Sequence, residues 1–124
     1  MLTPAAYGLA LLLGLFVLVI GARFLLQPRA AAAIGYGVPA EPGGDAAYLE
    51  IKGLRDASTG ILGLALLAFA GAHAEAWFMV AAALLPLGDA LIVLRHGGTR
   101  AAAFGIHFVT AAVVPVSAAL LFLA

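Results

Sequence analysis

The chain has 124 residues, of which 65% are hydrophobic and only 10% are charged. A soluble domain carries about a quarter charged residues, so this composition leaves too little polar surface to cover a core in water and favours a membrane protein. Six Lys and Arg residues balance six Asp and Glu residues, which gives no basic excess for binding nucleic acid. The absence of cysteine excludes disulfides, Cys-ligated zinc and Cys nucleophiles.

The first transmembrane helix is predicted over residues 4–27. A helix that crosses a bilayer needs about 20 predominantly apolar residues, and the run from Ala5 to Ala22 contains no charge. No basic residue precedes this run, so we expect a retained helix, with a cleaved signal peptide as the alternative. Pro28 ends the helix, and the turn-rich stretch from Pro28 to Asp45 predicts a loop with Asp45 as the next N-cap.

Three further transmembrane helices are predicted over residues 46–71, 76–96 and 99–123. The helix over 46–71 is polar in its first half and apolar or small in its second half. A turn over residues 72–75 precedes the third helix, Gly97 and Gly98 end it, and Thr99 caps the fourth. The sequence therefore predicts an all-α fold, an integral membrane four-helix bundle that forms a single transmembrane domain over residues 1–124.

The distribution of Lys and Arg predicts the orientation in the membrane, because these residues are concentrated in cytoplasmic loops. The second connection and both termini carry none, whereas the first loop and the third connection are flanked by Arg23, Arg29, Lys52, Arg55, Arg95 and Arg100. We therefore expect loops one and three to be cytoplasmic and both termini to be outside. Short loops and the high Ala and Gly content favour a bacterial inner membrane.

Ionisable residues gather in the predicted cytoplasmic half of the second helix. Such residues are costly at membrane depth, so they normally face the bundle interior and find partners there. Helical spacing places Tyr48, Lys52, Asp56 and Thr59 on one face, which makes Lys52 and Asp56 natural i,i+4 partners. Arg55 lies beside this face.

The other helices add ionisable residues at a similar depth. Glu50 points away from the face that carries Lys52, and Arg23 on the first helix is its expected partner. Asp89 lies about two turns before the end of the third helix, and His107 lies about two turns into the fourth. Asp89 can also pair with Arg55 across helices.

These residues predict a polar pocket that opens toward the cytoplasm. Titratable groups in a low-dielectric site can do general acid–base work, so we expect Asp56, Asp89 and His107 to be catalytic. The expected pocket-binding residues are Arg23, Tyr48, Glu50, Lys52, Arg55 and Thr59. The alternative is that Lys52–Asp56 and Arg55–Asp89 are ion pairs that only lock the helices together.

The sequence is compatible with three functions. The first is a membrane enzyme that carries out acid–base chemistry on a lipophilic small molecule; whether the chain is an enzyme at all stays open. The second is a proton-coupled transporter or channel, and the third is an accessory subunit of a membrane complex. The expected partners are the lipid bilayer, a lipophilic small molecule and a second copy of the chain, with no nucleic acid, cofactor or metal.

Several segments together resemble a known family. They are Gly21-Ala22-Arg23-Phe24 with Pro28, Gly35-Tyr36-Gly37, Tyr48 to Asp56 with Gly60, and Asp89. They are similar to the DUF4267 family of small four-helix membrane proteins and, more distantly, to DoxX-like bundles. The segment from Lys52 to Asp56 is the most specific part. This family has no assigned activity, so the resemblance implies the fold, and makes the polar half of the second helix a family feature, without implying a reaction.

Overall fold

The computed structural model describes residues 2–36 and 46–124, and this part of the chain is helical with short turns. Three stretches are long and apolar enough to cross a membrane, namely Thr3–Leu26, Ala72–Arg95 and Arg100–Leu123. The elements in chain order are α1 (Leu2–Leu26), α2 (Pro28–Tyr36), α3 (Ala46–Phe69), α4 (Ala72–Ala82), α5 (Leu84–Arg95), α6 (Arg100–Ala102), the π-helix η1 (Ala103–Phe108) and α7 (Val109–Leu123). The structure thus confirms the all-α prediction and a membrane-embedded chain, whereas membrane crossing by α3, with its polar first half, stays a prediction.

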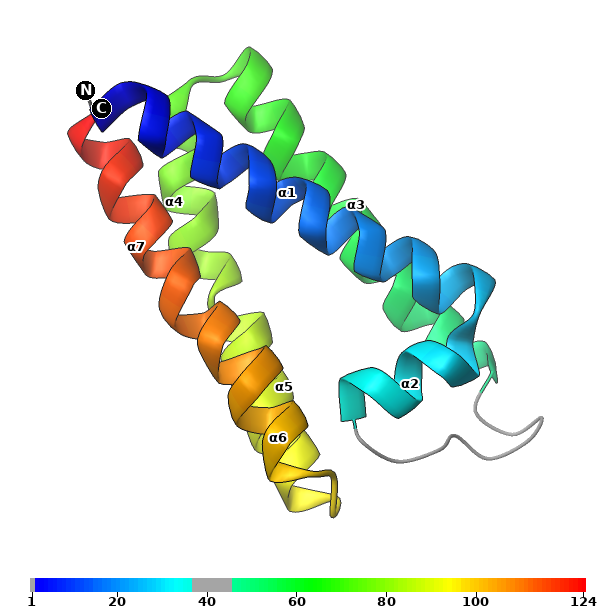
Figure 1. Cartoon of the computed structure of the whole chain (residues 1–124). Helices are drawn as coiled ribbons and strands as arrows, with labels where there is room; N and C mark the ends of the chain where they lie inside the picture. Colours follow the sequence, from blue (N-terminus) through cyan, green and yellow to red (C-terminus); the bar gives the residue numbers. More distant parts are fainter. Residues whose placement is uncertain (1, 37–45) are drawn as a thin grey trace.

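The helices form two pairs that diverge from a shared end (Figure 1). Helix α1 runs beside α3 in the opposite direction, and α4 with α5 runs beside η1 and α7. The pairs meet near the chain termini, where Ala6 and Ala10 of α1, Ala76 and Met79 of α4, and Val114, Ala118 and Leu121 of α7 form a buried cluster. Toward the opposite end the pairs separate, and α2 lies beside them there.

Glycines bring α1 and α3 into backbone contact. A Cβ atom added at Gly53 would lie 2.8 Å from the carbonyl oxygen of Gly21, and one added at Gly60 would lie 2.8 Å from the carbonyl oxygen of Gly14. Helices in lipid associate by such close packing of small residues. The contact fixes the polar first half of α3 against the charged end of α1.

A predicted loop and a predicted turn differ from the structure. Pro28 does not open a loop but begins α2, where the missing N–H of proline is tolerated because the first turn has no intrahelical partner for it. The rest of the predicted loop from residue 37 to Asp45 lies outside the described residues. The predicted turn over 72–75 is helical, because Ala70 and Gly71 make the turn between α3 and α4, with φ 96° at Gly71, and α4 begins at Ala72.

The last two predicted helices are interrupted. The helix predicted over 76–96 divides at Ala83 into α4 and α5, because Pro86 cannot donate to the carbonyl of Ala82. The helix predicted over 99–123 is capped by Thr99 as expected, whose hydroxyl accepts from the Ala102 N–H at 3.1 Å. It then contains the π-helical segment η1, a distortion that often occurs at functional sites.

Candidate functional site

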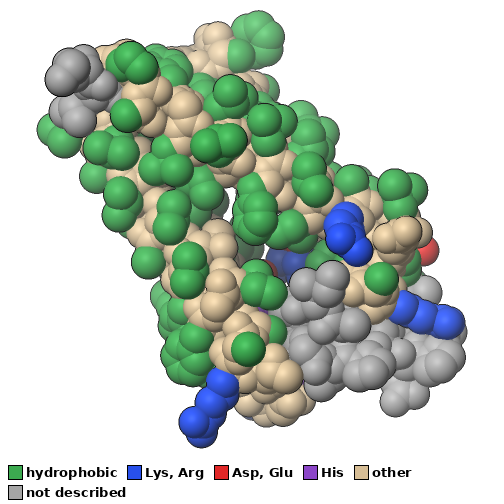
Figure 2. All heavy atoms as spheres, in the orientation of Figure 1, with side chains coloured by type: hydrophobic (Ala, Val, Ile, Leu, Met, Phe, Trp, Pro, Cys, Tyr) green, Lys and Arg blue, Asp and Glu red, His purple; other side chains and the backbone are tan. Residues whose placement is uncertain are grey.

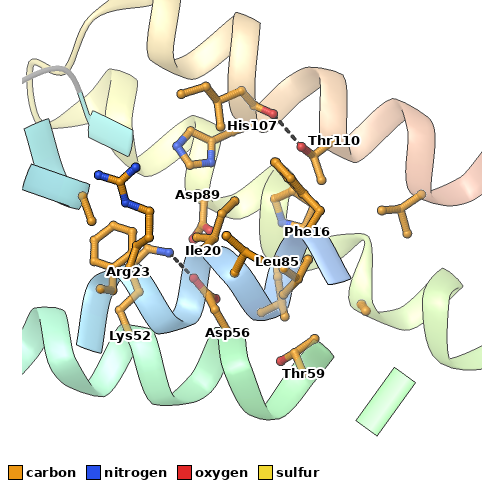
Figure 3. Close-up of a pocket in the computed structure, with 18 residues that line it drawn as sticks. Phe16, Ile20, Arg23, Lys52, Asp56, Thr59, Leu85, Asp89, His107 and Thr110 are labelled. Atoms are coloured by element: carbon orange, nitrogen blue, oxygen red, sulfur yellow. Dashed lines mark hydrogen bonds and ion pairs between the residues drawn. The ribbon is translucent and has the colours of Figure 1, made fainter. Parts of the chain in front are cut away.

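A cavity of about 430 Å³ lies between the two helix pairs. Figure 2 shows the molecule hollowed there, with basic side-chain atoms visible inside. Most of the wall is apolar, with Phe16, Val17, Val19, Ile20, Phe24 and Ala31 on one side and Ala82, Leu85, Pro86, Ile106 and Val114 on the other. The polar side chains on the wall are Arg23, Lys52, Asp56, Thr59, Asp89, His107 and Thr110, all of which are labelled in Figure 3.

A chain of three ion pairs joins α3 to α5 beside this cavity. The Nζ atom of Lys52 lies 2.5 Å from Oδ2 of Asp56, and Nη2 of Arg55 lies 3.3 Å from Oδ1 of the same carboxylate. Arg55 also reaches Oδ2 of Asp89 at 3.4 Å. Asp56 is only 8% exposed, so its charge is buried, and the two cations compensate it. Both pairings expected from the sequence, Lys52–Asp56 and Arg55–Asp89, are present.

The two basic residues on the cavity wall have different surroundings. The ammonium group of Lys52 lies 4.5 Å from the centre of the Phe24 ring, a cation–π geometry, in addition to its bond with Asp56. Arg23 forms no ion pair with Glu50 or with any other residue in the described part of the chain. The expected Arg23–Glu50 pair is therefore not formed, and Arg23 faces the cavity instead (Figure 3).

The structure brings the three predicted catalytic residues to one cavity. Asp56 comes from α3, Asp89 from α5 and His107 from η1, and all three line the wall. His107 is only 8% exposed. Figure 3 shows these side chains pointing toward a common space near Lys52 and Arg23.

Three predicted pocket residues lie away from this cavity. Tyr48 is 74% exposed, because the neighbouring Leu49 takes the buried position against Phe24 and α2. Glu50 is exposed on the outer side of α3. Arg55 lines a second, smaller hollow with Asp89 and His96, next to the first. Of the six predicted pocket residues, Arg23, Lys52 and Thr59 line the larger cavity.

A family model described as a domain of unknown function (DUF4267) matches residues 14–121. The chain belongs to the DUF4267 family. The match includes every residue that lines the cavity, from Phe16 to Val114. Comparisons with curated proteins and with solved structures find no match.

This DUF4267 chain also buries a carboxylate that the sequence reasoning assigned to a turn. Glu75 lies in the first turn of α4 and is 3% exposed, and its Oε2 atom has no hydrogen-bond partner among the described residues. A Cβ atom added at Gly63 of α3 would lie 3.0 Å from Glu75 Oε1, so the glycine makes room for the carboxylate. The Ser117 hydroxyl on α7 is likewise buried without a partner in the described part. Recognising Ala70 and Gly71 as the whole turn is the signal that would have placed Glu75 inside a helix.

Proposed function

We propose that this chain is an integral membrane protein that binds a lipophilic small molecule in the cavity and carries out acid–base chemistry on it. One observation carries the proposal: an apolar wall that brings together Asp56, Asp89 and His107. A volume of about 430 Å³ lies within the range of ligand-binding pockets, roughly 300–1,000 Å³. Ionisable residues inside apolar segments commonly mark substrate sites, which supports a binding role.

The surroundings of the three groups favour different roles. An imidazole both gives and takes a proton near neutral pH, so His107 is the proposed proton-transfer group. Asp89, held by Arg55 at 3.4 Å, is the proposed second group. Asp56 already accepts from Lys52 and Arg55, so its proposed role is to hold these cations in place.

The proposed orientation places the wide end of the cavity toward the cytoplasm. All six Lys and Arg residues lie on helices that extend to the end where the two helix pairs separate. The basic side chains visible in Figure 2 lie at that end. Cytoplasmic enrichment of Lys and Arg supports this orientation, with both termini outside a bacterial inner membrane.

Photolabelling tests the binding part of the proposal. The probe is a diazirine derivative of hexadecanol, added to the protein in detergent micelles, with labelled peptides mapped by mass spectrometry. We expect labels on cavity residues and at least a fivefold loss of them in Ile20→Trp, which fills the cavity. The matched control is Leu12→Trp on the outer surface of α1, where Leu12 is exposed and does not line the cavity. Equal labelling of the two variants would contradict the proposal.

Lipid conversion tests the chemical part. The wild-type protein is incubated with a bacterial lipid extract, and products are followed by mass spectrometry. We expect at least one conversion that His107→Gln abolishes while the variant still takes up the hexadecanol probe. If no conversion depends on His107 or Asp89, the cavity binds without catalysing.

A proton-coupled transporter is the second candidate, and Glu75 favours it. This buried carboxylate lies on α4 toward the closed end of the molecule, away from the cavity wall. Intramembrane carboxylates serve as proton relays in transporters. Flux driven by a pH gradient in proteoliposomes, lost in Glu75→Gln and retained in His107→Gln, would favour transport over catalysis.

A further inference from the structure

We infer that the cavity takes a single-chain amphiphile with an anionic carboxylate or phosphate head, which binds Arg23. The inference rests on the proposed function, which supplies binding without naming the ligand class. It is carried by a juxtaposition: a guanidinium group without an ion-pair partner among the described residues lies at one end of an apolar cavity.

Among the described residues, one cation on the cavity wall has no ion-pair partner. Two carboxylates, Asp56 and Asp89, are matched through three ion pairs with Lys52 and Arg55. Arg23, on the cavity wall, is therefore the cation left without an ion-pair partner in the described part of the chain. A cation next to an apolar cavity in a membrane favours a counter-charge, and the ligand is the group that supplies it.

The chemistry of the two wall cations assigns the head group to Arg23. Lys52 is already occupied by Asp56 at 2.5 Å and by the Phe24 ring. A guanidinium group carries five N–H donors in a planar fork that matches a carboxylate or phosphate with two parallel hydrogen bonds. Figure 3 shows Arg23 on the cavity side of α1, beside Lys52.

The wall next to Arg23 fits an apolar chain. Ile20 lies three residues before Arg23 and Phe16 seven residues before it, so both lie on nearly the same face of α1 and extend about 10 Å along the helix. Leu85 and Val114 form the opposite wall. The cavity volume of about 430 Å³ is at the lower end of the range for ligand pockets, which favours one chain over two.

A set of matched probes tests the inference by equilibrium binding in detergent micelles. Palmitate and hexadecyl phosphate carry an anionic head, hexadecanol carries the same chain without charge, and dipalmitoyl phosphatidic acid carries two chains. We expect the anionic single-chain probes to bind about 10-fold to 100-fold more tightly than hexadecanol, the range for hydrogen bonds to a charged group. Whichever of palmitate and hexadecyl phosphate binds with the higher affinity identifies the head group of the ligand.

Two variants of α1 and one of α2 separate the outcomes. Arg23→Gln should reduce the preference for palmitate over hexadecanol to about onefold, and Arg23→Lys should keep part of the preference. Arg29→Gln is the control, because Arg29 is exposed on α2 and does not line the cavity.

An unchanged preference in Arg23→Gln, with hexadecanol still bound, overturns the anionic inference and leaves the proposed function standing. Failure of all four probes to bind the wild-type protein overturns the proposed function. Tighter binding of phosphatidic acid than of hexadecyl phosphate overturns the single-chain assignment.

Discussion

Replacing Asp56 by Asn removes the central charge of the ion-pair chain. The side chain keeps its size, but Lys52, whose side chain is only 13% exposed, loses the carboxylate that lies 2.5 Å from its ammonium group. Removing one partner of a buried ion pair costs about 3–5 kcal/mol, because the other charge stays buried without compensation. The first expected consequence of Asp56→Asn is therefore a loss of folding stability, before any effect on ligand binding.

The exposure of Arg55 places the expected loss at the lower end of that range. Its side chain is 43% exposed, and its distance to Asp56 is 3.3 Å, so it contributes at most about 1 kcal/mol as a solvent-screened pair. We expect Asp56→Asn to lower the free energy of unfolding by about 3 kcal/mol. The assay is unfolding in mixed micelles of increasing denaturing detergent, followed by the fluorescence of Trp77, the single tryptophan.

A double-mutant cycle with Lys52→Met provides the control. The variant that combines both substitutions buries no unpaired ammonium, and replacement of a whole buried pair by uncharged residues is often nearly neutral. We expect it to be more stable than Asp56→Asn alone. Additive losses in the double variant, or a loss below about 1 kcal/mol in Asp56→Asn, would refute the reasoning.

The same unfolding assay checks three further predictions. Gly53→Ala should lower the free energy of unfolding by about 1–3 kcal/mol, because the new methyl group would lie 2.8 Å from the backbone of α1. Gly8→Ala is the control and should not be destabilised, because no atom lies within 4 Å of an added Cβ there. Equal effects of the two substitutions would contradict the glycine contact. Glu75→Gln should keep or raise the free energy of unfolding, because it removes a charge without a partner among the described residues. The control is Glu50→Gln at an exposed position, which should be nearly neutral. A marked loss of stability in Glu75→Gln would show that the ionised carboxylate is compensated. Thr99→Ala should lower the free energy of unfolding by about 1 kcal/mol, because it removes the N-cap hydrogen bond. An unchanged stability would show that the bond to Ala102 contributes nothing.

Local spacing made part of the site predictable from the sequence. The Lys52–Asp56 pair follows from its i,i+4 separation on one helix, which does not depend on tertiary structure. The Arg55–Asp89 pair followed from the cost of leaving charges alone at membrane depth. Both arguments use polar residues, which are scarce in this chain and therefore informative.

The apolar wall was not predictable in the same way. On a membrane helix, lipid-facing and cavity-facing positions are equally apolar, so α1 carries no pattern that separates Ile20, which lines the cavity, from Leu12, which faces outward. Glu75 was missed for a different reason, since its place in a helix depends on a turn of only two residues, Ala70 and Gly71, with φ 96° at Gly71.

The glycine positions explain why the cavity lies between the helix pairs and not within the α1–α3 pair. Gly21 and Gly53 leave no room between α1 and α3, because each occupies space where a Cβ atom would meet the backbone of the other helix. Gly88 of α5 and Gly105 of η1 have no atom within 4 Å of an added Cβ, so these glycines do not draw the second pair toward the first. Close backbone contact therefore holds Lys52 against Phe24 on one side, while the diverging helices opposite leave Asp89 and His107 on the wall of the cavity.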